Sequence, residues 1–176
     1  MKSLKIENLG AYCDAREQIF LQKILLHVQT RVAEKRERFR GLVDSWYAFY
    51  MREGFVKTTG SVQWFNFKDL AQKRHHPAIW KMHFISDKAK QVLISGGSDR
   101  LIKDHAVPVK ILLQELSALK PITTADVKAF LLNRYRLGII TKCEDDQLCG
   151  PLKSGFLPSS LEFDCFARYR VVGICV

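Results

Sequence analysis

The sequence has no hydrophobic run long enough to cross a membrane, because no stretch approaches about 18 consecutive apolar residues. The N-terminal segment MKSLKIENLGAYCDARE also lacks the apolar core of a signal peptide. Motifs of several common enzyme classes are missing too: there is no phosphate-cradling glycine loop, no nucleophile elbow and no HExxH pattern. These absences argue against P-loop nucleotide hydrolysis, serine hydrolases and the best-known zinc proteases. We expect a cytoplasmic protein.

Cysteine occurs in an odd number, which does not fit a disulfide framework. Five residues are spread through a chain of 176 residues: Cys13, Cys143, Cys149, Cys165 and Cys175. Small secreted domains instead have dense, even-numbered cysteines. We therefore expect free thiols. A zinc site of four thiolates is the weaker alternative, because the spacing of these cysteines is not that of a zinc knuckle.

Acidic residues are scarce relative to basic ones. The chain has 28 Lys and Arg against 18 Asp and Glu, which gives a net charge of +10. Such a surplus repels itself unless a polyanion is near, and nucleic acid is the default polyanion for a basic protein. The basic residues are not gathered on one short amphipathic helix, so a membrane surface is not expected. We expect a nucleic-acid partner, DNA rather than RNA, and a homodimer is left open.

The length and the hydrophobic pattern predict a single α+β domain over residues 1–176, rich in helix. Apolar residues at spacings of three and four predict a long basic N-terminal helix from about Asp14 to Met51. We assign residues 1–55 to a helical N-terminal part. Residues 84–176, with a few short strands, form the candidate catalytic part.

Basic side chains that could contact phosphates lie in three segments. The candidate nucleic-acid-binding residues are Arg31, Lys35, Arg36, Arg38, Arg40, Lys73, Arg74, Arg168 and Arg170. The first segment would follow a phosphate backbone along one helix face, or would be a solvated face with Glu/Arg pairs. Arg168 and Arg170 would share a face in a strand and could hold a phosphate by bidentate hydrogen bonds, or could pair with nearby acids.

Residues 54–84 combine glycines with alternating aromatic residues. The pattern predicts a turn or short hairpin, followed by a helix from about Lys68. The aromatic residues Trp64, Phe65 and Phe67 would either stack on unpaired bases or belong to the core. The adjacent His75 and His76 would form half of a metal site only with partners from elsewhere in the chain.

The second half contains distinct helix and strand signals. Ser86 is a predicted N-cap for a helix over 87–95, which Gly96 and Gly97 end. Strands are predicted near 100–105 and 138–143, with helices from about 108 and over 125–135 between them. Thr141, with Glu144 three residues later, predicts a capping box at the start of a short helix.

The segment Lys103-Asp104-His105-Ala106-Val107-Pro108 places an Asp-His pair at the end of a predicted strand, before a proline and a helix. It resembles the opening of the HNH, or His-Me finger, nucleases. The resemblance implies that His105 is a general base that activates water for attack on a phosphodiester. It also implies that Asp104 is a ligand of one divalent ion, Mg²⁺ or Mn²⁺, at the scissile phosphate.

A later unit, GIITKCEDDQL, has a strand followed by an acidic helix start. It would complete a strand-strand-helix finger, with one of Glu144, Asp145 or Asp146 near His105 as a supporting metal ligand. Local chemistry offers an alternative. Asp104 would cap the following helix, His105 would hydrogen-bond in a loop, and the three carboxylates would favour their own helix N-terminus.

The resemblance and the charge together predict a metal-dependent, HNH-like endonuclease. It would hydrolyse phosphodiester bonds of DNA, in a restriction, defence or toxin role. The first alternative is a non-catalytic DNA- or RNA-binding protein, which would tolerate a chelator and lose affinity with salt. The second alternative is a protein-interaction subunit that docks through an exposed aromatic segment over residues 46–67.

Overall fold

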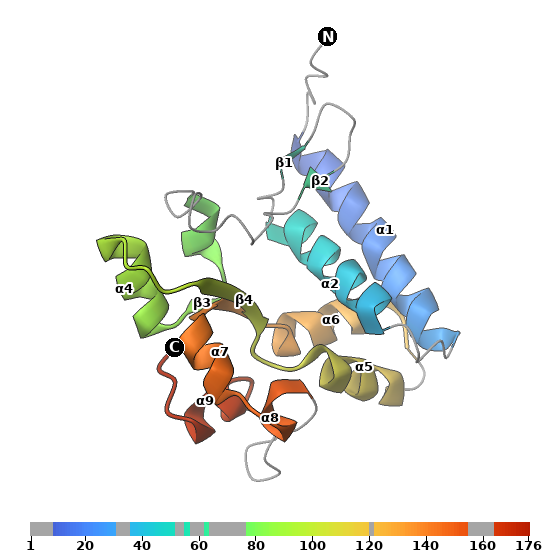
Figure 1. Cartoon of the computed structure of the whole chain (residues 1–176). Coiled ribbons are helices and arrows are strands. Elements are labelled where there is room, and N and C mark those ends of the chain that lie inside the picture. The colour runs from blue at the N-terminus through green and yellow to red at the C-terminus, as the bar shows by residue number, and fades with distance from the viewer. Residues whose placement is uncertain are drawn as a thin grey trace. The chain divides into compact units, whose positions relative to one another are not determined.

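The computed structural model of the chain describes residues 9–30, 36–51, 55–56, 62–63, 77–119, 122–154 and 164–176. Contacts group the chain into two compact units. Unit 1 comprises residues 1–65 and 113–131, and unit 2 comprises residues 66–112 and 132–176. The fold is α+β and helix-rich, with a small mixed sheet in the second half (Figure 1), as the sequence predicts. The assignment of one domain over residues 1–176 stays a prediction.

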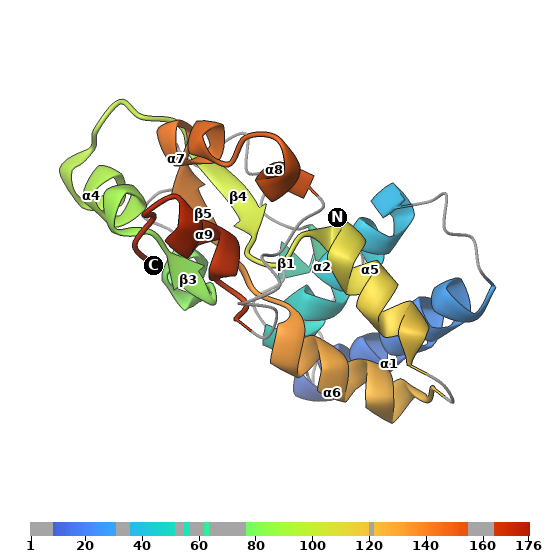
Figure 2. The ribbon, with the colours of Figure 1, turned by 90° about the horizontal axis from the view of Figure 1, so that it is seen from below.

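Unit 1 is built around two helices that lie side by side, α1 (Leu9–Gln29) and α2 (Arg36–Met51) (Figures 1 and 2). The start of α2 meets the end of α1, where the rings of His27 and Phe39 stack with centroids 5.8 Å apart. Farther along α2, Phe49 stacks on Phe20 of α1 at 5.5 Å. The two helices therefore run antiparallel, with buried residues such as Ile24 and Val43 filling their interface.

The prediction of one continuous helix over residues 14–51 is wrong, because the structure has two helices in this range, α1 and α2. A single long helix cannot bury its own apolar face, whereas two antiparallel helices bury each other's. Residues 31–35 between them, including Arg31 and Lys35, lie outside the described residues. The short antiparallel pair β1 (Phe55–Val56) and β2 (Val62–Gln63) confirms the predicted hairpin.

The chain passes from unit 2 to unit 1 within α5 (Val109–Ala118) and returns within α6 (Thr124–Arg134). Both helices confirm sequence predictions. In unit 1, Leu116 and Val127 are fully buried, and Lys128 forms an ion pair with Glu17 of α1 at 2.9 Å. These contacts hold the second half of α5 and most of α6 in unit 1.

Unit 2 contains the three-stranded sheet. Its order is β3 (Phe84–Ile85), β5 (Leu137–Thr141), β4 (Leu101–His105), with β5 parallel to β3 and antiparallel to β4 (Figure 2). All five residues of β5 are buried, as expected of a central strand covered on both faces. Register pairs Leu101 with Thr141 and His105 with Leu137, so His105 and Thr141 lie at opposite ends of the β4–β5 pair.

Successive strand residues face opposite sides of the sheet. One face packs Ile85 and Ile139 with α4 (Asp87–Ser95) and η2 (Pro77–Lys81). The other face packs Phe84 and Ile140 with Tyr169 of α9 (Ala167–Val171). The short helices α7 (Lys142–Gln147) and α8 (Pro151–Ser154) follow β5 in the chain.

The predicted caps of unit 2 are confirmed. The Ser86 side chain accepts a hydrogen bond from the Ala89 N–H at the start of α4, and Gly96 ends that helix in the left-handed conformation with φ of 77°. Thr141 and Glu144 form the predicted capping box of α7. Among the described helices, none combines the length and the apolar character needed to span a bilayer.

Candidate functional site

The guanidinium of Arg168 is the centre of a buried polar cluster that joins β4, α8 and α9 of unit 2. We call Asp104, Arg168 and Tyr169 the Arg168 cluster. Nη2 of Arg168 donates to the Asp104 carboxylate in a salt bridge and to the His105 carbonyl at 2.6 Å. The Tyr169 hydroxyl donates to the same carboxylate oxygen, Oδ2, at 2.7 Å. The Arg168 side chain is 2% exposed, so these contacts are shielded from water.

The remaining donors of Arg168 are also used. Nε donates to the Ala106 carbonyl at 2.9 Å, and Nη1 donates to the carbonyls of Leu152 and Lys153 at 3.1 and 3.3 Å. A guanidinium has five N–H groups in a fixed plane, so none is left for a ligand phosphate. The cluster therefore serves to join chain segments.

The sequence-based placement of Arg168 on a phosphate-binding surface is corrected by this geometry. Residues 167–171 form a helix, in which two residues separated by one position do not share a face. Arg168 points into the core, whereas the Arg170 side chain is 69% exposed and pairs with Asp164 at 2.6 Å. The two arginines do not form a common phosphate clamp.

Asp104 occupies the carboxylate position of the Arg168 cluster rather than a helix cap. Burial and the neighbouring Asp104 carboxylate raise the pKa of Tyr169 well above its usual value, so the phenol stays protonated and continues to donate. One oxygen of Asp104 thus receives two strong hydrogen bonds. This use competes directly with metal ligation by the same oxygen.

His105 lies on the opposite side of β4 from Asp104, in a cluster of three rings in unit 2. Tyr135 is fully buried and meets His105 edge-on with ring centroids 5.5 Å apart, and His83 meets the same tyrosine edge-on at 6.0 Å. His105 is itself 5% exposed. We call His83, Tyr135 and His105 the histidine–tyrosine cluster.

His83 is a functional candidate that sequence reasoning missed. Its Nδ1 accepts a hydrogen bond from the Leu137 N–H at 3.1 Å. Desolvation of the ring and the neighbouring Arg136 guanidinium lower the pKa of His83 to about 4. The ring is therefore neutral near pH 7, with its proton on Nε2, and acts as a hydrogen-bond donor there rather than as a general base.

Because folding lowers the pKa of His83, this residue should make the stability of the protein depend on pH. The pKa of His83 in the folded protein is about 4, below the ordinary value of 6.5. Between these pH values the unfolded chain binds more protons than the folded protein. The free energy of unfolding therefore falls as the pH falls from 6.5 towards 4. The effect fades as the pH rises through 6.5. Because the residue as a whole is exposed and only its ring is partly desolvated, we expect the effect to be no more than about 1 kcal/mol. NMR titration of the ring should give a midpoint near 4, and a midpoint near 6.5 would contradict this desolvation of the ring.

The carboxylates of residues 144–146 have local partners. Oε2 of Glu144 accepts from the Ser86 hydroxyl at 2.6 Å and from the Thr141 N–H at 2.8 Å. Asp145 pairs with Lys153 at 3.2 Å, and Asp146 pairs with Lys142. The local alternative, in which these acids support the start of their own helix, agrees with this arrangement.

These residues do not fit one divalent ion shared with His105. Glu144 is bound at the Thr141 end of the β4–β5 pair, while His105 lies at the Leu137 end. The two ends are four residue steps apart along the strand, which corresponds to roughly 13 Å, whereas metal ligands lie within about 2–2.6 Å of their ion. Among the residues that the structure describes, no group of three or more His, Cys, Asp or Glu side chains could hold a metal ion.

No family model, curated protein or solved structure matches the chain. Function is therefore inferred from the residues of this chain alone.

Other predicted site residues fall into two groups. Arg38 is exposed and Arg40 is half-buried on α2. The following predicted residues lie outside the described residues, or their side chains do: Arg31, Lys35, Arg36, Trp64, Phe65, Phe67, Lys73, Arg74, His75 and His76. The helix predicted from about Lys68 also begins there.

The cysteines and the aromatic segment have clear placements where they are described. All five cysteines are free thiols, and three of them, Cys143, Cys149 and Cys175, are exposed. In the proposed docking segment over 46–67, Trp46 and Phe49 are buried in unit 1, so they do not contribute to an exposed aromatic patch.

Proposed function

We propose that the protein binds nucleic acid through phosphate contacts from Lys and Arg side chains on its surface. The observation that carries this proposal is the surplus of cations, 28 against 18 acids, with more Lys and Arg than Asp and Glu in each of the two units. Such a surplus favours a polyanionic partner and fast electrostatic association.

Part of this surplus is free for phosphate. Arg38, Lys88, Arg100 and Lys110 are exposed, and no carboxylate of the described residues forms an ion pair with them. Other cations, such as Lys90 with Asp87, already have an acidic partner. The unpaired cations are the better candidates, because phosphate binding there costs no existing ion pair.

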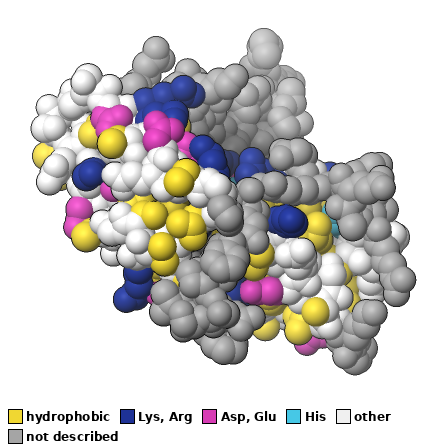
Figure 3. Space-filling model, turned by 60° about the horizontal axis from the view of Figure 1, so that its bottom comes forward, with side chains coloured by type: hydrophobic (Ala, Val, Ile, Leu, Met, Phe, Trp, Pro, Cys, Tyr) yellow, Lys and Arg dark blue, Asp and Glu magenta, His cyan; other side chains and the backbone are white. Residues whose placement is uncertain are grey.

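The distribution of Lys and Arg side chains on the surface favours separate contacts with phosphates of a nucleic acid. On the face shown in Figure 3, Lys and Arg side chains form several small groups, with Asp, Glu and hydrophobic side chains between them. Contacts of this kind position a protein on a phosphate backbone without reading its sequence. At these contacts, the protein would therefore bind DNA or RNA with little dependence on the base sequence.

Binding of labelled duplex DNA, single-stranded DNA and RNA should weaken linearly on a log–log scale between about 50 and 200 mM salt. The double variant Arg100→Gln/Lys110→Gln removes two unpaired cations of unit 2. It should reduce the salt slope by roughly 2, because each lost phosphate contact removes about one counterion.

The matched control is Lys90→Gln/Arg170→Gln, which removes the same charge from cations that already pair with Asp87 and Asp164. We expect a clearly smaller change in slope for this variant. Equal slopes for the two double variants would mean that only net charge matters. An absence of salt-dependent binding to all three nucleic acids would overturn the proposal.

Phosphodiester hydrolysis with His105 as general base is the second candidate. It is favoured by one observation: β4, which ends at His105, pairs antiparallel with β5, and α7 follows directly. This is the strand-strand-helix order implied by the resemblance to His-Me finger nucleases. The carboxylates 144–146 do not support a shared ion with His105, so this candidate would depend on Asp104 or on groups outside the described residues.

Plasmid DNA and structured RNA, incubated with Mg²⁺ or Mn²⁺ and in parallel with EDTA, separate the two functions. Under the binding proposal, we expect no cleavage, and affinity that EDTA leaves unchanged. Cleavage that requires metal and disappears in His105→Ala, with binding retained, would replace the binding proposal by the nuclease. The retained binding is needed as a control because His105 is buried and its replacement could disturb the fold.

A further inference from the structure

Two cations and a phenylalanine share one face of α1 in unit 1. Arg16, Phe20 and Lys23 follow one another at spacings of four and three residues, which place their side chains on the same face of the helix. The guanidinium carbon of Arg16 lies 5.7 Å from the centroid of the Phe20 ring, and Nζ of Lys23 lies 5.1 Å from the same centroid. We call these three residues the Phe20 cluster.

Neither cation of the Phe20 cluster is engaged by an acid. Among the described residues, no carboxylate forms an ion pair with Arg16 or Lys23. Their charged groups lie over aromatic rings instead, Phe20 for both cations and also Phe49 for Arg16. Nε of Arg16 is buried without a hydrogen-bond partner. A half-buried guanidinium without an anion is costly, so an anionic ligand beside the cluster would stabilise it.

The two acids of α1 do not neutralise this face. Asp14 is two residues from Arg16 and nine from Lys23, and these spacings place it on the opposite side of the helix. Glu17 is 6% exposed and pairs with Lys128 at 2.9 Å. The charge of the Phe20 cluster is therefore available to a phosphate.

The Phe20 ring is held in place by the core of unit 1. The ring of Phe49, which is 3% exposed, stacks on Phe20 with centroids 5.5 Å and planes 20° apart. Phe20 itself is half-buried. Because Phe49 occupies one face of the ring, a ligand ring would stack on the other face. Lys23 is exposed and its long side chain is flexible, so its ammonium can exchange the ring for a phosphate.

We propose that the Phe20 cluster binds a single-stranded stretch of nucleic acid, with a base stacked on Phe20 and with phosphates held by Arg16 and Lys23. Aromatic rings beside cations bind single strands with little dependence on sequence, because every base has a π-face. Arg16 and Lys23 are seven residues apart, which is about 10.5 Å along the helix. This distance spans about three nucleotides of a strand at the stacked spacing of about 3.4 Å.

The geometry favours a single strand over a duplex. In a duplex the bases are stacked on one another, whereas unpaired bases can turn towards an aromatic side chain. The inference rests on the proposed function, because it assigns one contact site, and the kind of strand bound there, to a protein that binds phosphates by its surface cations.

The first test compares oligo(dT) with an abasic oligomer of equal length, which has the same backbone charge and no bases. Phe20→Leu keeps an apolar side chain and removes the ring. It should weaken binding of oligo(dT) at least about fivefold, the lower end of the effect of one stacked base. Binding of the abasic oligomer should not change, and Phe20→Tyr, which restores a ring, should bind both oligomers like the parent.

Tyr50→Leu is the matched control for loss of a ring. Tyr50 is 38% exposed, and Lys128 lies over its ring at 5.9 Å, but this cation is already paired with Glu17. We expect oligo(dT) affinity within about twofold of the parent. An equal loss for Tyr50→Leu and Phe20→Leu would contradict a site at the Phe20 cluster.

The second test concerns the cations. Arg16→Gln/Lys23→Gln should reduce the salt slope for oligo(dT) by roughly 1.4, because each contact to a single strand accounts for about 0.7. Lys90→Gln/Arg170→Gln removes the same charge from cations that are already paired with acids, and should change this slope less. Equal changes would mean that the two cations of α1 have no special part in binding.

The third test uses the unmodified protein, so it does not depend on the folding of a variant. Ultraviolet cross-linking to oligo(dT), followed by tryptic digestion and mass spectrometry, should mark the peptide EQIFLQK. This peptide comprises residues 17–23, and Phe20 is its one aromatic residue. Competition with unlabelled oligo(dT) should suppress the cross-link, and competition with duplex DNA of equal length should suppress it less. Cross-links confined to other peptides would count against the Phe20 cluster.

The outcomes separate this inference from the proposed function. Salt-sensitive binding that Phe20→Leu leaves unchanged, or weakens equally for the two oligomers, would leave nucleic-acid binding in place and overturn base stacking on Phe20. Absence of binding to duplex and to single strands would overturn the proposed function itself and this inference with it.

Discussion

Replacing Arg168 by leucine is expected to lower the free energy of unfolding by about 3–5 kcal/mol, the range found when one partner of a buried ion pair is removed. The substitution leaves the Asp104 carboxylate without its cation and leaves the carbonyls of Ala106 and Leu152 without their donor. Leucine cannot satisfy these oxygens. Urea unfolding followed by circular dichroism measures the change, and an unchanged m-value would show that both proteins unfold from a similarly compact state.

Arg170→Leu is the matched control, because it makes the same substitution in the same short helix. The Arg170 side chain is 69% exposed and its pair with Asp164 lies at the surface, so we expect a change below about 1 kcal/mol. Comparable losses for the two variants would contradict a special role for the Arg168 cluster. The double variant Arg168→Leu/Asp104→Leu should be more stable than Arg168→Leu alone, since it no longer buries an unpaired carboxylate.

Local signals in the sequence were sufficient for much of unit 2. The N-cap at Ser86, the left-handed stop at Gly96 and the capping box of Thr141 and Glu144 all depend on residues within a few positions of each other. The two caps pair a side chain with an N–H group of the next turn, and the Gly96 N–H donates to the Val92 carbonyl one turn back, so no information from distant segments is needed. β4 and β5 are also short segments that begin after recognisable helix-ending or turn residues, which made their positions predictable from the local sequence.

The role of Asp104 shows where such signals end. Its partner Arg168 is 64 positions away in the sequence, and nothing in the segment from Lys103 to Pro108 encodes that pairing. A short Asp-His-x-x-Pro match is therefore compatible with a metal ligand and with a buried ion pair. The alternation of side chains along β4 adds a further constraint, because it places Asp104 and His105 on opposite faces of the sheet.

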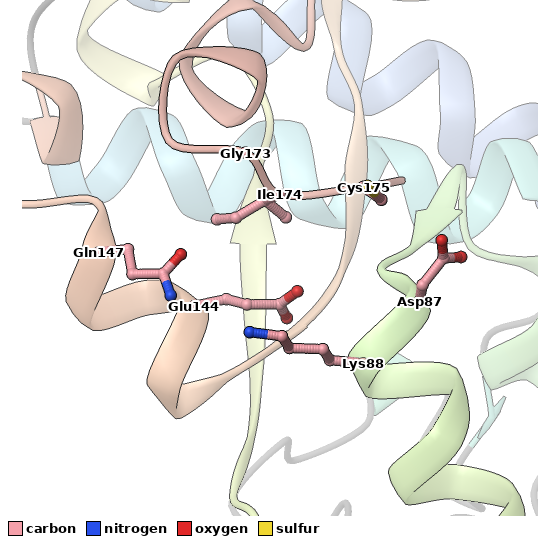
Figure 4. A pocket seen from close by; sticks show the side chains of 7 residues that line it. All are labelled: Asp87, Lys88, Glu144, Gln147, Gly173, Ile174 and Cys175. Carbon is pink, nitrogen blue, oxygen red and sulfur yellow. The ribbon is translucent and has the colours of Figure 1, made fainter.

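His83 and the separation of α1 from α2 could not be predicted for related reasons. His83 precedes a strand of only two residues, which gives no detectable period, and its partner Leu137 comes from β5. The division into two helices depends on packing between their apolar faces, which the spacing of those residues alone does not determine. The capping role of Glu144 was predictable, whereas the pocket that Glu144 lines with Asp87 and Ile174 (Figure 4) depends on segments that are far apart in the sequence.

Gly138→Ala is expected to lower the free energy of unfolding by about 3 kcal/mol, at the upper end of the range for overpacking a core. Gly138 lies in the central strand β5, paired with Phe84 on one side and Asp104 on the other. A methyl group there would lie within 3.0 Å of the Phe84 carbonyl oxygen and of its ring. Because a backbone oxygen is one of the obstacles, rotation of the Phe84 side chain alone cannot relieve the clash, and β3 has to shift away from β5.

Gly41→Ala adds the same methyl group on the exposed side of α2, where no atom of the described residues lies within 4 Å. Alanine restricts the unfolded chain and favours helix, so we expect this variant to raise the free energy of unfolding by roughly 0.5–1 kcal/mol. The two variants should therefore change stability in opposite directions in the same denaturant titration. A Gly138→Ala protein as stable as the parent would mean that β3 and β5 do not approach as closely as the pairing of Phe84 with Gly138 requires. In that case the packing of Phe84 against Tyr169 would also differ from the structure described here, and with it the position of the Tyr169 hydroxyl that donates to Asp104.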